Sequence, residues 1–184
     1  EGVEQLHGWV FELASWRDPH GLEGGEHGPA DELVADSLAK TGAYIMGRHM
    51  FSGEGGPWGP EPFEGWWGDE PPFRLPVYVL THHAREPLVK GGTTFSFVTD
   101  GIESALAQAQ AAAGDKDVQL SGGANMIQQY LAAGLVDELQ IHVAPVMLGG
   151  GVRLFDTLPR LVELEPAQVV ASPKAAHLYY RIPK

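Results

Sequence analysis

The stretch that decides the fold is Asp117–Gly151, DVQLSGGANMIQQYLAAGLVDELQIHVAPVMLGGG. Its pattern predicts a short apolar strand, a tight turn at Gly122-Gly123, an amphipathic helix that ends at Gly134, and a second strand that leads to a glycine loop, Gly149–Gly151. A glycine turn before a helix exposes backbone N–H groups beside the positive end of the helix dipole, which suits a phosphate. An ordinary strand-to-helix connection has the same pattern, so this stretch alone favours neither reading.

The composition is that of a single globular domain over residues 1–184, with 43% hydrophobic and 20% charged residues. The formal net charge of −12 argues against a nucleic-acid partner. The absence of cysteine excludes disulfides and thiolate chemistry, and the eight histidines show no metal-binding spacing, so no metal is expected. No apolar run reaches transmembrane length and no signal-peptide pattern opens the chain, so we expect a cytoplasmic protein without a membrane partner.

Outside the opening stretch, helical and strand patterns alternate along the chain. Apolar residues recur at helical spacing over Pro29–Lys40 and Ile102–Ala113. We expect Gly42 to end the first helix, and Asp100 with Glu103 to cap the second. Short apolar runs predict strands, and these are Ala43–Met46, Val77–Leu80, Thr94–Val98 and an antiparallel pair, Leu161–Ala171 and Ala176–Ile182. This order implies a largely parallel sheet with antiparallel edge strands and helices on both faces.

Two segments lack a regular pattern. Ser15–Pro29 is glycine-rich and polar, and predicts a long loop. Ser52–Pro76 is rich in proline and contains Trp58, Trp66 and Trp67, so we expect irregular structure there. Trp66, Trp67 and Phe73 could form a lid or substrate wall, but a dimer contact or a local core is the favoured interpretation.

The residues that follow three of the predicted strands indicate a ligand site. They are Gly-Arg-His at 47–49, Thr-His-His at 81–83 and Ser-Gly-Gly at 121–123. Because ligands of open α/β sheets bind beyond the carboxyl ends of the strands, these runs predict a cradle for a molecule with several phosphates. Neither the G-x-G-x-x-G nor the P-loop pattern is present. The run at 81–83 suits a 2′-phosphate, with a solvated loop as the alternative.

Several motifs occur in an order that resembles the dihydrofolate reductase superfamily. They are Tyr44–Phe51 (YIMGRHMF), Val79–Thr81, Leu120–Gly123, Gly134–Leu139 and Pro145–Gly151. The series is most similar to the branch related to the reductase domain of bacterial riboflavin biosynthesis, the C-terminal domain of the deaminase-reductase. The resemblance covers roughly residues 29–155 and implies a three-layer αβα fold with a mixed sheet. The family's first strand would precede the start of this sequence and is absent from it.

The resemblance also implies NADPH as the cofactor, bound along the strand ends. Residues 47–49 would hold the pyrophosphate and 2′-phosphate side, residues 81 and 82 would lie near the adenosine, and residues 122–125 would meet the pyrophosphate. The full set of expected cofactor residues is Gly47, Arg48, His49, Thr81, His82, Ser121, Gly122, Gly123, Ala124 and Asn125.

On the substrate side, the resemblance implies a carboxylate in the first turn of the helix before the Gly-Arg motif, and Asp31 lies there. A carboxylate facing a nicotinamide would bind an N–C–N edge through two hydrogen bonds. The helix dipole alone also favours an acid at this position, and Glu32 has an equal claim. Arg153 is the candidate for a ribose phosphate, and Trp66 is a candidate substrate contact.

The expected function is an NADPH-dependent reductase that passes hydride to a small heterocyclic or imine/carbonyl substrate, in the manner of the riboflavin-pathway reductase. One alternative is dihydrofolate reductase activity that uses Asp31. The other is a non-catalytic nucleotide-binding or assembly protein of the same fold. A homodimer is the expected assembly, because a sheet that lacks one strand leaves an edge open to pairing.

Overall fold

The structure is a computed structural model that describes residues 3–156 and 158–184. The chain divides into two compact units. The central unit is Lys40–Tyr130, and the terminal unit combines the residues up to Ala39 with Leu131–Lys184. Each unit has a sheet of its own and is described by itself.

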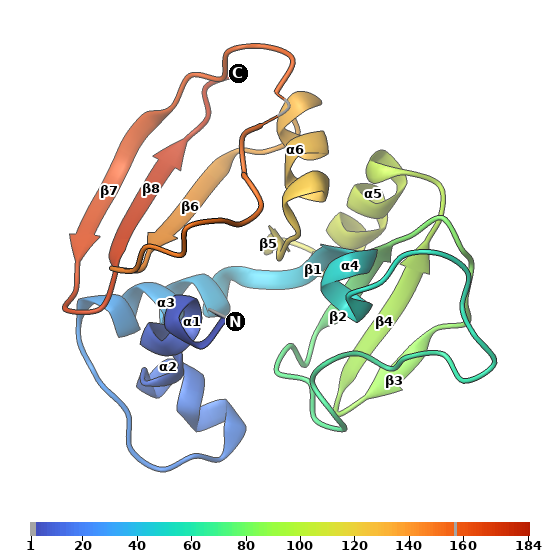
Figure 1. Cartoon of the computed structure of the whole chain (residues 1–184), viewed down its shortest axis with the longest axis horizontal. Coiled ribbons are helices and arrows are strands. Elements are labelled where there is room, and N and C mark those ends of the chain that lie inside the picture. Colours follow the sequence, from blue (N-terminus) through green and yellow to red (C-terminus); the bar gives the residue numbers. More distant parts are fainter. Residues whose placement is uncertain (1–2, 157) are drawn as a thin grey trace. The chain divides into compact units, whose positions relative to one another are not determined.

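The central unit contains a five-stranded sheet of order β3-β4-β2-β1-β5 (Figure 1). β1, β2, β4 and β5 run parallel, and β3 pairs antiparallel with β4 at the edge. The strands are β1 (Thr41–Gly47), β2 (Pro76–Leu80), β3 (Leu88–Lys90), β4 (Thr93–Val98) and β5 (Asp117–Leu120). The helices that begin in this unit are α4 (Arg48–Ser52), α5 (Ile102–Ala113) and α6 (Ala124–Ala132).

The two faces of this sheet bury different kinds of side chain. One face carries an apolar cluster of Tyr44, Met46, Phe51, Val77, Val79 and Phe95. Trp58, Trp67 and Phe73, from the irregular segment between α4 and β2, pack against that cluster. On the other face, Ala43 and Ile45 alternate with the cluster residues along β1, and α5 packs there through small alanines. The prediction that this segment forms a local core is confirmed for Trp67 and Phe73, while Trp66 is exposed.

The terminal unit contains a three-stranded antiparallel sheet of order β6-β8-β7. Its strands are β6 (Glu138–Val143), β7 (Glu165–Ala171) and β8 (Ala176–Arg181). Its N-terminal elements are α1 (Val3–Phe11), α2 (Ala14–Arg17), the 3-10 helix η1 (Asp18–His20) and α3 (Pro29–Lys40). The described sheets and helices confirm an α/β fold of mixed strands with antiparallel C-terminal strands.

The predicted bounds of α3 and α5 are confirmed exactly as given. The predicted irregular structure between α4 and β2 is confirmed as well, because residues 53–75 contain no helix or strand. The C-terminal strands pair antiparallel as predicted, but they join β6 in a separate sheet and are not edges of the parallel sheet. The predicted loop at 15–29 is helical as far as His20. β3 and α4 were not predicted, because each is only three to five residues long.

The helix bounds hold, but the residues predicted to cap two of the helices are wrong. Gly42 does not cap α3, because it lies inside β1, where the strand passes close to Ala113 and Lys116. Asp100 does not cap α5, since the N-cap residue is Gly101, which forms no side-chain cap. The Asp100 carboxylate instead accepts a hydrogen bond from the Thr99 hydroxyl. A single domain over residues 1–184 stays a prediction.

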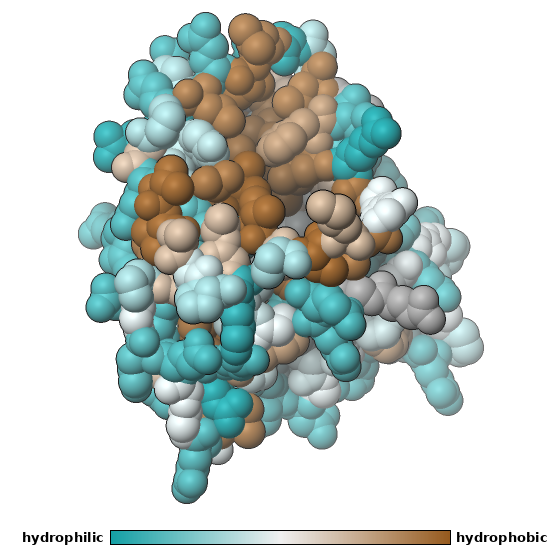
Figure 2. All heavy atoms as spheres, turned by 60° about the vertical axis from the view of Figure 1, so that its left-hand side comes forward, coloured by the Kyte–Doolittle hydropathy of each residue, from teal (hydrophilic) through white to brown (hydrophobic). Residues whose placement is uncertain are grey.

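The surface of the terminal unit carries many apolar side chains. They lie mostly between the end of β6 and β7, and they include Val143, Val146, Met147, Leu148, Val152, Phe155, Leu161 and Leu164. Figure 2 shows apolar surface gathered on the side that its rotation brings forward. Among the described residues, no helix is long and apolar enough to cross a membrane.

Candidate functional site

Three strand ends meet at one edge of the central sheet. β1 lies between β2 and β5 and runs parallel to both, so their carboxyl ends share an edge. The register places Gly47 beside Leu80, and Ile45 beside Leu120. The runs at 47–49, 81–83 and 121–123 therefore lie at this edge, as the sequence predicted.

Hydrogen bonds join the glycine turn after β5 to the end of β1. The Gly47 N–H donates to the Gly122 carbonyl over 2.8 Å, and the Ser121 N–H donates to the Ile45 carbonyl over 2.8 Å. The peptide bond between Gly122 and Gly123 is cis. Gly122 has a φ of +112°, a conformation that an L side chain rarely adopts. This backbone conformation therefore requires glycine at position 122.

The surroundings of this turn leave its backbone accessible. A Cβ built on Gly123 meets no atom within 4 Å, and a Cβ on Gly47 would lie 3.7 Å from the Gly123 nitrogen. The nine-residue helix α6 begins directly after the turn, at Ala124. The first N–H groups of a helix have no partner within the helix, so this turn provides donors and a positive dipole end for an anion. The Asn125 amide oxygen is engaged by the Gln129 side chain, at 2.8 Å.

Arg48 is held beneath the tryptophan-rich segment. Its guanidinium carbon lies 3.4 Å from the centre of the Trp58 ring, and its Nη1 donates to the Ser52 hydroxyl. Its Nε is buried and has no hydrogen-bond partner. Burial lowers the pKa of Arg48, and the charge of Arg85 lowers it further, while Glu54 acts in the opposite direction. Arg48 is thus a partly buried cation with a free donor at the strand-end edge.

The turn after β2 is organised by its own hydrogen bonds. Thr81 is 7% exposed, and its hydroxyl accepts from the His83 N–H over 3.2 Å. The His83 carbonyl accepts from the Trp58 indole N–H over 2.9 Å. His82 and His49 are exposed. The Thr81 hydroxyl therefore stabilises the turn, and the exposed imidazoles are the groups available to a ligand.

Arg85 is a member of this site that the sequence reasoning missed. Its guanidinium carbon lies 4.8 Å from the centre of the Trp58 ring and 5.0 Å from that of Phe97. Its Nη1 donates to the Phe63 carbonyl over 2.7 Å. Burial lowers the pKa of Arg85, against the opposing charge of Glu64. The sequence signal was an arginine shortly after Thr81, but the aromatic rings that hold it come from distant segments.

The two arginines lie close enough to repel one another. Their guanidinium carbons are 3.4 and 4.8 Å from one ring centre, so they are no more than 8.2 Å apart. At an effective dielectric constant of about 20, two unit charges at that distance repel by at least about 2 kcal/mol before screening by salt. Within residues 3–156 and 158–184, neither arginine forms an ion pair with a carboxylate. The site thus concentrates positive charge on a protein of net charge −12.

Asp31 lies in the terminal unit, in the first turn of α3, and is 9% exposed. One carboxylate oxygen accepts from the Ser15 N–H over 2.7 Å, and the other lies 3.2 Å from the His27 Nδ1. Burial acts to raise the pKa of Asp31, but hydrogen bonds from Ser15 and His27 outweigh it and lower that pKa. Glu32, the other candidate, is exposed. Asp31 is therefore an ionised acceptor that also anchors α3 to α2.

The two remaining candidate residues lie on the surface. The Arg153 side chain is 81% exposed and lies 3.5 Å from the Asp156 carboxylate. Trp66, in the central unit, is 61% exposed, and its ring lies 4.8 Å from that of Phe63. Their substrate contacts stay predictions, as does the catalytic role of Asp31.

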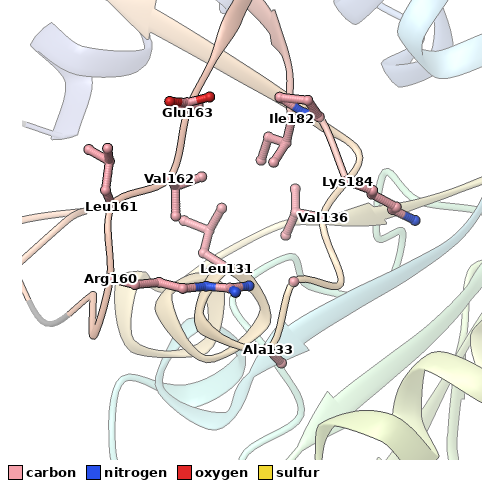
Figure 3. Close-up of a pocket in the computed structure, with 11 residues that line it drawn as sticks. Leu131, Ala133, Val136, Arg160, Leu161, Val162, Glu163, Ile182 and Lys184 are labelled. Carbon is pink, nitrogen blue, oxygen red and sulfur yellow. The ribbon is translucent and has the colours of Figure 1, made fainter.

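The terminal unit also contains a cavity of about 570 Å³, lined by the end of α6 at Leu131, the turn that follows it, residues 160–163 and residues 182–184. Figure 3 shows the side chains of Leu131, Val136, Val162 and Ile182 turned toward one another within it. Its charged lining residues are Arg160, Glu163 and Lys184, and Lys184 is paired with Asp137 at 2.7 Å. None of the described lining residues is one of the predicted site residues.

Comparison with protein families and curated proteins gives two matches. Residues 14–178 match the family described as the RibD C-terminal domain. A 50-residue segment is 40% identical to YyaP of Bacillus subtilis, a protein described as uncharacterized. That segment covers 27% of this chain and 27% of YyaP.

Solved structures show the same fold at low sequence identity. A riboflavin biosynthesis protein of Shewanella sp. PV-4 matches with a TM-score of 0.65 and 20% identity, over 90% of this chain and 86% of its own. RibD of Acinetobacter baumannii matches with a TM-score of 0.56 and 16% identity, over 88% of this chain and 53% of its own. A pyrimidine reductase-like protein of Corynebacterium diphtheriae matches with a TM-score of 0.53 and 13% identity, over 86% and 83%.

Proposed function

Because the chain belongs to the RibD C-terminal domain family, we propose that it is an NADPH-dependent reductase that delivers hydride to a small heterocyclic or imine/carbonyl substrate. The observation that carries the proposal is the meeting of three strand ends at one sheet edge, with a glycine turn on one and arginines beside the others. The fold is the dihydrofolate reductase-like fold of the riboflavin-biosynthesis reductases. The names of the structural relatives agree with a reductase, and the substrate class follows from them by analogy.

The residues at this edge fit a dinucleotide with phosphates. The Gly122-Gly123 turn and the first N–H groups of α6 would receive the pyrophosphate, and Gly47 leaves room for it because it has no Cβ. Arg48, with its unpartnered buried Nε, would supply a charged donor to the same molecule. When bound, NADPH supplies the hydride, and the protein's contribution is to orient it and to exclude water.

On the substrate side, the lowered pKa of Asp31 supports a role as hydrogen-bond acceptor over a role as proton donor. Its lowered pKa keeps the carboxylate ionised near neutral pH, so it is suited to accept hydrogen bonds from N–H groups of a heterocycle. It is less suited to deliver a proton, which the dihydrofolate reductase alternative asks of it. This difference favours a substrate of the riboflavin-pathway kind, with Arg153 as the candidate for a ribose phosphate.

Binding of NADPH, NADP⁺ and NADH is the first experiment, followed through quenching of tryptophan fluorescence. We expect NADPH to bind, and failure of all three to bind at millimolar concentration would remove the enzyme proposal. The variant Gly122→Val should abolish binding of the cofactor, because a β-branched residue at a φ of +112° forces the turn to rearrange. Binding by Gly122→Val at the affinity of the parent protein would show that this turn is not the pyrophosphate site.

Substrate choice is tested by Asp31→Asn and Arg153→Ala, assayed with dihydrofolate and with a ribosylaminopyrimidinone. Glu32→Gln is the matched control for Asp31→Asn, because Glu32 is adjacent and exposed. We expect Asp31→Asn to lower kcat/KM while Glu32→Gln does not, and Arg153→Ala to act only on the phosphorylated substrate. If neither Asp31→Asn nor Arg153→Ala has an effect, both substrate readings are wrong.

The second candidate function is a nucleotide-binding or assembly protein that retains the fold without the reaction. Its supporting observation is that both Asp31 oxygens are already engaged by Ser15 and His27. The two functions are separated by the loss of NADPH absorbance in the presence of candidate acceptors.

A further inference from the structure

Asp31 and His27 form a carboxylate–imidazole pair, here called the Asp31–His27 dyad, at the start of α3. The Asp31 Oδ2 lies 3.2 Å from the His27 Nδ1. The other carboxylate oxygen, Oδ1, accepts a hydrogen bond from the Ser15 backbone N–H over 2.7 Å. Asp31 is buried, whereas the His27 side chain is 81% exposed. A carboxylate fixed from within the terminal unit therefore holds an imidazole that is open to solvent.

The dyad determines which nitrogen of the imidazole is available to a ligand. An ionised carboxylate is a hydrogen-bond acceptor only, so its contact with Nδ1 places a proton on that nitrogen. Nε2 lies on the far side of the ring from Asp31, and the exposure of His27 leaves it accessible. Pairing with a carboxylate in this way fixes the tautomer and the orientation of an imidazole.

The other charged side chains near the dyad have partners of their own or lie in solvent. Glu26, which precedes the imidazole in the chain, lies 3.4 Å from the Lys174 Nζ, and Lys174 also pairs with Glu12. Glu32, which follows the dyad's carboxylate in α3, is exposed. The carboxylate of the dyad is therefore the one placed to orient the imidazole.

The proposed reduction needs a proton as well as a hydride. Hydride addition to the carbon of a C=N or C=O bond breaks the π bond and leaves an electron pair on the heteroatom, which then takes up a proton. Asp31 does not supply that proton near neutral pH, because its lowered pKa keeps the carboxylate ionised. An imidazole gains and loses its proton at about pH 5 to 8, so His27 is the member of the dyad suited to the task.

We propose that His27 is the catalytic proton donor of this reductase and that Asp31 is the positioning residue that orients it. Protonated His27 gives the proton on Nε2 to the substrate heteroatom, so an N–H bond of the imidazole breaks and an N–H or O–H bond of the product forms. The substrate carbon is reduced, the nicotinamide is oxidised, and solvent returns a proton to His27. This inference rests on the proposed function and deepens it. Asp31 still accepts hydrogen bonds from the substrate, since an ionised carboxylate has about four acceptor sites.

The test measures kcat and KM against pH for the parent protein and His27→Gln, with the ribosylaminopyrimidinone and dihydrofolate as substrates. Loss of the proton donor should lower kcat about 100-fold or more, with little change in KM. In the parent protein kcat should fall as the pH rises and the imidazole loses its proton, and His27→Gln should lack that fall. Free imidazole should restore part of the activity of His27→Ala, because solvent reaches this position.

His20→Gln is the matched control, because His20 is also a histidine of the terminal unit but its Nδ1 lies 2.6 Å from the Trp16 carbonyl, which cannot ionise. It should retain the parent kcat and pH profile. Two further measurements do not depend on turnover. Nitrogen-15 NMR of the neutral His27 ring should place the proton on Nδ1, and Asp31→Asn should weaken that preference. NADPH should bind His27→Gln as tightly as it binds the parent protein.

The shape of the pH profile separates a proton donor from a structural residue. If His27→Gln keeps the parent kcat, or loses kcat but keeps the fall with pH, the assignment of His27 is wrong while the reductase function stands. A parent protein whose neutral His27 carries its proton on Nε2 would overturn the role given to Asp31. A parent protein that reduces neither substrate overturns the proposed function and this inference together.

Discussion

Gly42 lies in β1 where the strand passes against the C-terminal end of α5. A Cβ added to Gly42 would lie 2.8 Å from the Ala113 Cα, 2.8 Å from the Ala113 carbonyl oxygen and 2.8 Å from the Lys116 Cβ. Two of these neighbours are backbone atoms, which cannot rotate away. The variant Gly42→Ala therefore requires α5 or β1 to shift.

The expected cost follows from two opposing effects. Overpacking of a well-packed contact costs about 1–3 kcal/mol, and two fixed backbone neighbours place Gly42→Ala in the upper part of that range. Replacing glycine by alanine restricts the unfolded chain, which returns about 0.4–1 kcal/mol. We expect a net loss of about 1–2 kcal/mol, which corresponds to a fall in Tm of about 2–8 °C for a chain of this size.

The assay is urea unfolding with Gly47→Ala as the matched control, since Gly47 lies at the other end of the same strand. A Cβ on Gly47 would meet its nearest neighbour, the Met126 Cβ, at 3.5 Å, an ordinary contact. Gly47→Ala should therefore unfold within about 0.5 kcal/mol of the parent protein. If Gly42→Ala is as stable as Gly47→Ala, the close approach of β1 to α5 is not what requires glycine at this position.

Two further predictions concern the terminal unit. His142 and His177 face each other with their Nδ1 atoms 2.8 Å apart, and burial followed by the charge of His177 lowers the pKa of His142 from 6.5 to about 4. Because His142 takes up its proton at a higher pH in the unfolded chain than in the folded one, the free energy of unfolding should be constant above about pH 6.5 and should fall as the pH drops toward 4. Urea unfolding of His142→Gln at a series of pH values should show a shallower fall. A fall as steep as that of the parent protein would show that His142 is not responsible. The lowered pKa of Asp31 acts in a separate window, below its ordinary value of 3.8. The exposed apolar residues of this unit favour a homodimer, so sedimentation should give twice the chain mass of 19.8 kDa. Met147 is 101% exposed, and Met147→Glu should shift the sedimenting mass toward that of the monomer, while Val89→Glu in β3 should not. A parent protein that sediments at 19.8 kDa would show that the dimer does not form.

Much of the fold was predictable because its signals are local. α3 and α5 repeat apolar residues at helical spacing, so both were placed to the residue even though Gly42 and Asp100 do not cap them. The meeting of the strand ends was also predictable, since parallel neighbours bring their carboxyl ends to one edge. The separation of the C-terminal strands into their own sheet was not, because strand patterns do not say which strands pair.

The sequence by itself determined the glycine turn after β5 and its place at the start of a helix, because Gly122-Gly123 follows a short apolar run and precedes residues with helical spacing. It also determined that residues 47–49 and 81–83 would lie beside that turn. Only the tertiary structure decided that Arg48 and Arg85 stack on one ring, and that Ser15 engages Asp31. The physical reason is that periodicity and turn chemistry act between neighbours in the chain. Contacts between side chains of distant segments depend on how the loops that carry them close over the sheet.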